Sequence, residues 1–267
     1  MRPFLKWAGG KYRLAARIKA KLPQGVRLLE PFAGSCALSL NTDYQAYWLN
    51  DINRDLINLY QALQSEGTNF IGFCREYFTP ENNSPEKYYE LRKQFNQETD
   101  IYKKSALFIF LNRHGYNGLS RYNASGEFNV PFGKYLKPYF PEKELLYFLA
   151  KFKNAQFSSI DFEAMLSKAS PGDLVYCDPP YEPLTETSNF TSYSAGGFGR
   201  TEQERLAEAA VRTAARGIPV LISNHCTQFI LSIYRQAKEI ETFPVRRSIS
   251  CDGANRNAVD EILAVFD

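Results

Sequence analysis

The sequence predicts an α/β protein: a doubly wound, mostly parallel sheet with a helical and hairpin lobe inserted into it. Short apolar runs alternate with helical patterns at both ends of the chain, as expected for strands buried between two layers of helices. The middle of the chain breaks this alternation, and 267 residues with 44% hydrophobic content suit one large domain that carries an insertion. We place the main domain at 1–53 and 142–267 and the lobe at 54–141.

The first two predicted strands each end in residues that suit a ligand. The strand 26–32 runs into Gly34 and Ser35 and is expected to open a helix, where small residues and free N–H groups let the backbone approach a bound group. The strand 46–49 leads to Asp51, an acid placed to bind the hydroxyl pair of a ribose. Together the two turns favour a cofactor that contains adenosine, although a glycine turn alone is commonplace.

The lobe is predicted to begin with helices and to end in turns. We expect two or three helices, of which 105–113 is the clearest, before a stretch from 115 to 141 that is punctuated by Gly, Asn and Pro. Within that stretch, 122–132 has the pattern of a hairpin that turns at Ser125 and Gly126.

The second half of the main domain is predicted to return to alternating strands and helices. Residues 201–216 form the most convincing helix, with Thr201 as the N-cap, Glu204 as its capping-box partner and Gly217 at its end. The predicted strands are 156–160, 173–177, 219–223 and a late antiparallel pair, 245–250 and 261–266.

The most specific chemical signal lies in Leu174-Val-Tyr-Cys-Asp-Pro-Pro-Tyr181. The apolar run is predicted to be a buried strand, and two prolines end it and leave Asp178 at its carboxyl end. A carboxylate and a free carbonyl can accept both hydrogens of an exocyclic amino group, while Tyr181 can stack on a planar base. The alternative is a strand that ends in a proline turn, with a capping Asp and a surface Tyr.

The amino-terminal run 4–12 is too rich in glycine for a helix and too cationic for a core strand. Trp7 and Lys11 could line a pocket for a ligand that carries a carboxylate. The alternative is a frayed tail, but two adjacent glycines beside a tryptophan favour close packing against another part of the chain.

Residues 87–140 carry the excess of positive charge. They hold nine Lys and Arg against four Asp and Glu, and thirteen of the 39 aromatic residues. Basic residues interleaved with aromatic ones are typical of a nucleic-acid surface, whereas the alternative is a solvated face over an aromatic core. The segment 112–123 concentrates amides, arginines and aromatics, and its Arg121 could bind O6 and N7 of a guanine.

Other classes of protein are disfavoured by what is sparse in the sequence. Five cysteines occur singly, which argues against a disulfide framework and fits a reducing cytoplasm. Neither of the two histidines has a partner at ligand spacing, so no metal is expected. No apolar run has the roughly 18 residues of a membrane span and the start of the chain lacks the apolar core of a signal peptide, so we expect no membrane contact.

The chain as a whole resembles the Dam-type DNA adenine-N6 methyltransferases, which methylate adenine in GATC. The resemblance extends nearly from end to end, with the cofactor motif first, the recognition lobe second and the catalytic tetrapeptide third. The matching segments are Phe4-Leu-Lys-Trp-Ala-Gly-Gly-Lys-Tyr12, Glu30-Pro-Phe-Ala-Gly34, Asp51-Ile-Asn53, Leu111-Asn-Arg113, Gly115-Tyr-Asn-Gly-Leu119, Arg121-Tyr-Asn123, Gly126-Glu-Phe-Asn-Val-Pro-Phe-Gly133, Asp178-Pro-Pro-Tyr181, Ile222-Ser-Asn-His225 and Val245-Arg-Arg-Ser-Ile-Ser250.

The resemblance implies S-adenosylmethionine as the cofactor and a target adenine that leaves the duplex. It implies that Asp178 and the carbonyl of Pro179 accept the N6 hydrogens while Tyr181 stacks on the base, and that the segment 189–193 closes over it. Methyl transfer expels a neutral thioether, so no metal is needed. The predicted cofactor contacts are Trp7, Lys11, Phe32, Gly34, Asp51 and Asp178.

The resemblance also implies contacts with double-stranded DNA. The positions that read or frame the GATC bases are Lys6, Leu119, Arg121, Pro131 and Tyr135, with Tyr116 and Asn117 at the flipped base. The positions that match phosphate contacts are Arg92, Arg113, Asn123 and Lys137. Lys134 stands where the family often has Arg, which would weaken a bidentate contact there.

One departure from the family pattern concerns the cofactor turn. The family has Phe-x-Gly-x-Gly, and in this chain the second of these glycines is Cys36. We expect its side chain to crowd the methionine part of the cofactor.

Two other functions stay open at the level of sequence. A methyltransferase that acts on amino groups of RNA or on protein glutamine can share the Asp/Asn-Pro-Pro-Tyr site, but the basic lobe disfavours it. A DNA-binding regulator on an inactive methyltransferase fold would not need the acids at 178 and 51. We further expect a monomer with no obligate protein partner, in the cytoplasm of a bacterial or phage-infected cell.

Overall fold

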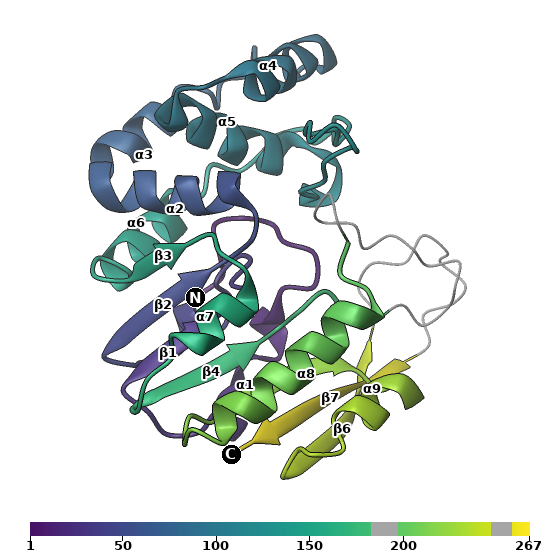
Figure 1. Ribbon diagram of the computed structural model, residues 1–267. Helices are drawn as coiled ribbons and strands as arrows, with labels where there is room; N and C mark the ends of the chain where they lie inside the picture. Colours follow the sequence, from purple (N-terminus) through teal and green to yellow (C-terminus); the bar gives the residue numbers. More distant parts are fainter. Residues whose placement is uncertain (183–196, 247–257) are drawn as a thin grey trace.

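The computed structural model describes residues 1–182, 197–246 and 258–267 (Figure 1). A seven-stranded sheet lies at its centre, with the strand order β3-β2-β1-β4-β5-β7-β6. The first five of these are parallel, while β7 is antiparallel to β5 and β6 is antiparallel to β7. The strands are β1 (Arg27–Glu30), β2 (Ala46–Asn50), β3 (Gln156–Ser158), β4 (Asp173–Cys177), β5 (Val220–His225), β6 (Glu239–Arg246) and β7 (Ala258–Phe266).

The sheet confirms the predicted doubly wound architecture. From β1 the chain passes outward to β2 and β3, and then β4 pairs with the other side of β1 and leads to β5. The register sets Arg27 beside Asp173 and Leu29 beside Val175, so that β1 and β4 end at the same edge of the sheet. Connections that leave two neighbouring parallel strands in opposite directions open a crevice at their carboxyl ends, which is where α/β proteins bind ligands.

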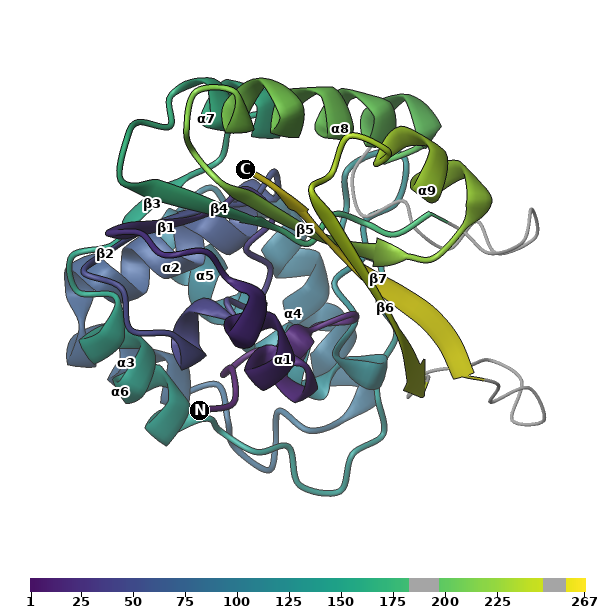
Figure 2. The same ribbon diagram turned by 90° about the horizontal axis from the view of Figure 1, so that it is seen from below.

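The strands bury both of their faces. Successive side chains point to opposite sides of a strand, so Leu28 and Leu174 enter one core while Leu29 and Val175 enter the other. Helices cover each core, as Figure 2 shows. The first core lies under α1 (Ala15–Lys21), α2 (Arg54–Glu66) and α6 (Glu142–Lys151), and the second under α7 (Phe162–Ser167), α8 (Arg200–Ala214) and α9 (Gln228–Ile233).

The inserted segment contains four helices, where two or three were predicted. They are α2, α3 (Thr68–Arg75), α4 (Pro85–Gln97) and α5 (Ile101–His114). Gly67, with φ +60°, separates α2 from α3, and α5 contains the predicted helix 105–113. Because α2 packs against both β3 and α5, it joins the lobe to the sheet, and the boundary at residue 54 stays a prediction.

The predicted hairpin of the lobe is a tight turn with two isolated bridges instead of a continuous ladder. The bridges pair Tyr122 with Phe128 and Gly115 with Phe132. In the loop that the Tyr122–Phe128 bridge closes, the Asn123 side chain accepts hydrogen bonds from the N–H groups of Ser125 and Glu127, at 3.0 and 2.9 Å. An Asn that binds backbone groups two and four residues ahead stabilises a turn, which explains why the segment reverses at the predicted place.

Two predicted helix starts are wrong. The turn after β1 does not open an α-helix: Gly34 and Cys36 have positive φ angles of 46° and 58°, and only a short 3-10 helix follows at Ser39–Asn41. Helix α8 begins at Arg200, so Thr201 lies inside it instead of capping it. The capping acid is Glu202, whose carboxylate accepts a hydrogen bond from the Gly199 N–H at 3.1 Å.

The late antiparallel pair is confirmed as β6 and β7, although β6 begins at Glu239. Residues 247–250 of the predicted strand and the predicted closing segment 189–193 lie outside the described residues. In the part of the chain that the structure describes, no helix combines the length and the apolar character needed to cross a membrane. The described cysteines, Cys36, Cys74, Cys177 and Cys226, are free thiols.

The ion pair between Arg27 and Asp173 joins β1 to β4 and should make stability depend on pH. Arg27 donates two hydrogen bonds to the carboxylate, at 2.8 and 2.7 Å. Burial alone would raise the pKa of Asp173, but hydrogen bonds from Arg27 and Ser170 lower it below its usual 3.8. The pair therefore stabilises the fold above about pH 4, and this contribution is lost as the pH falls through the lower folded-state pKa.

We expect Asp173→Asn to lower the free energy of unfolding by about 1–3 kcal/mol at pH 7 and by less at pH 3. Urea titrations at the two pH values measure the difference. As a control, Glu208→Gln removes an exposed pair with Arg212 and should change stability by less than about 0.5 kcal/mol. An equal loss for Asp173→Asn at both pH values would contradict the assignment.

Candidate active site

A pocket of about 870 Å³ opens at the carboxyl ends of β1, β2 and β4, where the strand order reverses. Its volume is within the range of small-molecule sites. Several predicted site residues line it: Lys6, Trp7, Lys11, Phe32, Gly34, Asp51, Asn117, Asp178, Pro179 and Tyr181. The structure therefore brings together the predicted catalytic tetrapeptide and the predicted cofactor contacts, along with two predicted DNA contacts.

The turn after β1 holds one wall of the pocket. A Cβ added to Gly34 would lie 2.7 Å from the indole nitrogen of Trp7, so only glycine lets the tryptophan pack this close to the backbone. The turn is held from both sides, because the Tyr60 hydroxyl donates to the Gly34 carbonyl at 2.5 Å and the Gly34 N–H donates to Asp51 at 3.0 Å. The predicted close packing of the amino-terminal run is thus observed at Trp7.

Asp51 follows β2 and faces the same pocket. Its second oxygen accepts a hydrogen bond from the Asn53 N–H at 2.9 Å. Burial raises the pKa of Asp51, while the two backbone hydrogen bonds oppose that shift. Each carboxylate oxygen can accept more than one hydrogen bond, so Asp51 can hold the turn and still bind a ligand hydroxyl.

Cys36 does not crowd the pocket, contrary to the expectation from the sequence. Its side chain is fully buried in the core beside Leu28 and Tyr60 and is absent from the pocket wall. The positive φ of Cys36 directs the side chain away from the cavity while the backbone keeps the course of the turn. The departure from the family glycine therefore costs backbone strain, which non-glycine residues incur at positive φ, and leaves the cavity open.

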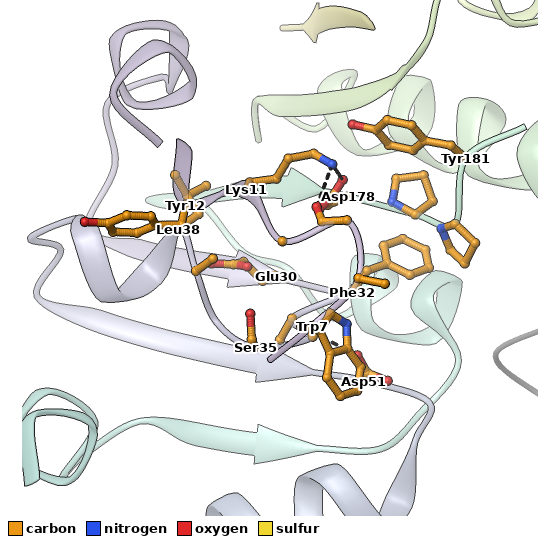
Figure 3. A pocket seen from close by; sticks show the side chains of 18 of the residues that line it. Trp7, Lys11, Tyr12, Glu30, Phe32, Ser35, Leu38, Asp51, Asp178 and Tyr181 are labelled. Atoms are coloured by element: carbon orange, nitrogen blue, oxygen red, sulfur yellow. Dashed lines mark hydrogen bonds and ion pairs between the residues drawn. The ribbon is translucent and has the colours of Figure 1, made fainter. Parts of the chain in front are cut away.

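Asp178 lies at the end of β4 and is held by two partners. Figure 3 shows the Lys11 ammonium reaching the carboxylate, where the Nζ to Oδ1 distance is 3.0 Å. The Ser223 hydroxyl donates to the same oxygen at 3.0 Å. Among the described residues, Asp178 Oδ2 and the carbonyl oxygen of Pro179 have no hydrogen-bond donor, so two acceptors remain beside each other at the pocket.

Tyr181 is fixed in orientation. Its hydroxyl donates to Glu261 on β7 at 3.1 Å, and its ring packs edge-on against His225 with centroids 4.8 Å apart. The Lys11 ammonium lies 4.3 Å from the ring centroid, a cation–π distance. Burial, followed by the negative charge of Asp178 and Glu261, raises the pKa of Tyr181, so the ring carries a neutral hydroxyl.

Two acids of the pocket were missed as functional residues. Burial raises the pKa of Glu30 to about 8, and the negative charge of Asp178 adds to this rise. Hydrogen bonds from the Ser39 hydroxyl and N–H act in the opposite direction and lower the pKa. Burial also raises the pKa of Glu261. Glu30 was recognisable as the last residue of a predicted strand, whereas nothing in the local sequence of Glu261 distinguishes it from other acids on strands. Among the described residues, no group of His, Cys, Asp and Glu is arranged to bind a metal ion.

Lys6 connects the pocket to the lobe. The Asn112 side chain binds both backbone groups of Lys6, at 2.9 and 2.8 Å, and the Lys6 ammonium lies 3.8 Å from the ring centroid of Tyr135. Burial, with the charge of Arg113, lowers the pKa of Lys6 to about 8. Tyr135 in turn accepts a hydrogen bond from the Asn117 N–H at 3.0 Å. Four positions with predicted DNA roles are therefore neighbours: Lys6, Arg113, Asn117 and Tyr135.

The other predicted DNA contacts lie outside the pocket. Tyr116, Arg121, Pro131, Lys134 and Lys137 are exposed, whereas Leu119 and Arg92 are half-buried. Arg92 donates to the Val130 carbonyl at 2.9 Å. Asn123 is committed to the turn described above, and Arg113 donates to the Tyr139 carbonyl at 3.0 Å. The structure therefore gives Arg113 and Asn123 structural partners that the sequence did not reveal.

Comparison with known proteins gives consistent matches. Residues 7–247 match the model of the D12 class N6 adenine-specific DNA methyltransferases. The chain is 49% identical to the DNA adenine methylase of Escherichia coli (strain K12) over 265 residues, which cover 99% of this chain and 95% of the relative. It is also 49% identical to a DNA adenine methylase of Vibrio cholerae and 47% identical to that of Serratia marcescens, in each case over 99% of this chain and at least 96% of the relative.

The raised pKa of Glu30 should appear as a slope of stability against pH. Because its folded-state pKa of about 8 exceeds the usual 4.5, the contribution of Glu30 to stability is greatest below pH 4.5 and is lost as the pH rises toward 8. Glu30→Gln keeps an acceptor for Ser39 and removes the titration. We expect the variant to gain stability over the wild type between pH 5 and pH 8, by a few kcal/mol at the upper end.

Urea unfolding of both proteins at several pH values tests this expectation. The matched control is Glu204→Gln, which changes an exposed acid on α8 and should keep the slope of the wild type. Parallel curves for wild type and Glu30→Gln would show that Glu30 is ionised in the folded protein throughout this range.

Proposed function

The chain belongs to the D12 class of N6 adenine-specific DNA methyltransferases, and we propose that it transfers the methyl group of S-adenosylmethionine to a flipped adenine of GATC in duplex DNA. One observation carries the proposal. Asp178 Oδ2 and the Pro179 carbonyl, two acceptors that no donor from the described residues occupies, share a pocket with Asp51, the acid suited to a ribose. A base-binding corner and a nucleoside-binding corner in one cavity suit a reaction between two adenosine groups.

The residues of the pocket fit S-adenosylmethionine. The glycine turn lets backbone approach the ligand, since a Cβ at Gly34 would meet Trp7. Asp51 can bind the ribose hydroxyls, and Trp7 and Phe32 offer apolar walls. Lys11 has three ammonium hydrogens, of which the described residues Asp178 and Gly9 bind two, so the third can bind the cofactor carboxylate. When bound, the cofactor supplies an electrophilic methyl group on a sulfonium.

The chain itself activates and positions the amino group. Asp178 and the Pro179 carbonyl each accept one N6 hydrogen of the adenine, which turns the nitrogen lone pair out of conjugation and toward the methyl group. The Tyr181 ring, fixed by Glu261 and His225, supplies the stacking surface. Acceptors that are already in place before the base arrives need no reorganisation, so positioning and electrostatics supply the rate.

The base must leave the duplex, because N6 is paired there and the pocket encloses the acceptors. Asn117 of the lobe lines the pocket, and the exposed Tyr116 precedes it, so the lobe lies where an extruded base would enter. The excess of basic residues in 87–140 supports duplex DNA as the substrate. We propose a monomer that acts in the cytoplasm of a bacterial or phage-infected cell.

Asp178→Ala should reduce methyl transfer to less than about a tenth of wild-type turnover, because a contact made to the reacting amino group is worth several kcal/mol. The measurement is transfer of a tritiated methyl group to a duplex that contains GATC, with cooperative thermal unfolding as the check on folding. The control is Asp43→Ala, which changes an exposed acid before β2, at the opposite edge of the sheet. A folded Asp178→Ala protein with near-normal turnover would overturn the mechanism.

Arg121→Ala should relax recognition of the last C·G pair of GATC. Arg121 is exposed, and it donates from Nε to the Asn129 side chain at 2.8 Å and from Nη2 to the Asn129 carbonyl at 3.4 Å, which holds the guanidinium while its remaining N–H groups can bind a guanine. A bidentate contact is worth roughly 1–3 kcal/mol, so turnover on GATA, GATG and GATT duplexes should rise relative to GATC. Equal losses on all four duplexes would remove Arg121 from the readout.

The matched control is Lys137→Ala, an exposed cation with a predicted phosphate contact. It should weaken binding to GATC and to unrelated duplex by similar factors. It should also reduce the slope of log affinity against log salt concentration by the equivalent of one phosphate contact, about one. A change in sequence preference would contradict that role.

A further inference from the structure

The end of β5 holds the catalytic tetrapeptide in place. Its last three residues, Ser223, Asn224 and His225, each bind the segment that follows β4. Ser223 binds Asp178, and the His225 ring lies 2.8 Å from the Glu182 carbonyl. This segment resembles a family motif; the proposed mechanism uses its His225 against the Tyr181 ring but gives Ser223 and Asn224 no role.

Asn224 acts on the backbone of the tetrapeptide. The fully buried amide donates to the Gln203 side chain at 2.9 Å, and Gln203 donates to the Pro180 carbonyl at 2.8 Å. The Asn224 oxygen accepts the N–H groups of His225 and Glu182, at 2.9 and 3.4 Å. The Pro180 carbonyl is thereby occupied, whereas no donor from residues 1–182, 197–246 or 258–267 binds the Pro179 carbonyl.

Ser223 acts on the side chain of Asp178, and the direction of its hydrogen bonds can be derived. The Ser223 hydroxyl has two acceptors within reach, Asp178 Oδ1 at 3.0 Å and the Cys177 carbonyl at 3.5 Å, and its single proton points to the nearer, charged one. The Tyr176 hydroxyl, 2.9 Å from Ser223 Oγ, must then be the donor to it. Burial keeps the pKa of Tyr176 well above its ordinary value, so the phenol retains the proton that it donates.

We propose that Ser223, held by Tyr176, is a positioning residue for methyl transfer: it fixes Asp178 Oδ1 so that Oδ2 faces the target amino group beside the Pro179 carbonyl. Without Ser223, Lys11 is the remaining partner of Oδ1 among the described residues, and a single ion pair to one oxygen does not define the rotation of the carboxylate. Ser223 is 1% exposed, so its hydroxyl binds the carboxylate without competition from bulk solvent. The inference rests on the proposed role of Asp178.

The test compares Ser223→Ala, Tyr176→Phe and the double variant in single-turnover and steady-state methylation of a GATC duplex. A hydrogen bond to a charged group in the reacting position predicts that Ser223→Ala lowers kcat about 10- to 100-fold with KM for DNA and for S-adenosylmethionine within about twofold. Tyr176→Phe should have a smaller effect. The double variant should match Ser223→Ala, because Tyr176 acts through Ser223.

Two further variants separate positioning from stability. Ser223→Thr retains the hydroxyl and should restore most of the turnover that Ser223→Ala loses. Thr213→Val removes a comparable buried hydroxyl on α8, where it binds the Ala209 carbonyl, and should lower the melting temperature without lowering kcat. Thermal unfolding of every variant shows how far each loss follows stability.

The outcomes are distinct. A folded Ser223→Ala protein with wild-type kcat would overturn the positioning role. The role would also be overturned if the kcat losses of Ser223→Ala and Tyr176→Phe multiplied in the double variant. A fall in turnover that tracks the fall in melting temperature equally for Ser223→Ala and Thr213→Val would also overturn it. Absence of methylation by the wild type would instead contradict the proposed function.

Discussion

The pairing of β1 with β4 is the constraint on which the site depends. The Gly34 turn follows β1 and Asp178 follows β4, so the proposed nucleoside-binding and base-binding corners lie at the ends of two neighbouring strands. Their register ends both strands at one edge, and the diverging connections keep that edge open. A slip of one residue would turn every apolar side chain to the opposite face, so the two buried cores that enforce the register also enforce the site.

Burial then determines the charge state of the pocket. Glu30, Asp51 and Glu261 each have a pKa raised chiefly by burial, and Lys11 pairs with a fourth acid, Asp178. Removing a carboxylate from water is costly unless hydrogen bonds or a cation offset the loss. The raised pKa values favour the protonated, neutral forms of Glu30, Asp51 and Glu261, so burial reduces the negative charge of the pocket. These acids lower the stability of the fold as the pH rises toward their folded-state pKa values.

Local patterns were sufficient for the sheet and for the acids at its edge. The observed bounds of β4 are the predicted ones, because an apolar run that stops at two prolines has few alternatives. Once β2 and β4 are placed, Asp51 and Asp178 must lie at their carboxyl ends. The lobe was harder: α2 and α3 are joined by one glycine, and a break marked only by the positive φ of Gly67 reads as a continuous helical pattern.

By itself the sequence determined the fold class, the family and the acids that follow the strands, because these depend on residue type and order along a short stretch. Tertiary structure alone decided which distant groups meet. Lys11 and Ser223 reach Asp178 from opposite ends of the chain, and Glu261 reaches Tyr181 from the last strand. It also decided that Cys36 turns into the core. Such contacts depend on how segments that are distant in the sequence pack together, and this packing cannot be inferred from the residues adjacent to each position.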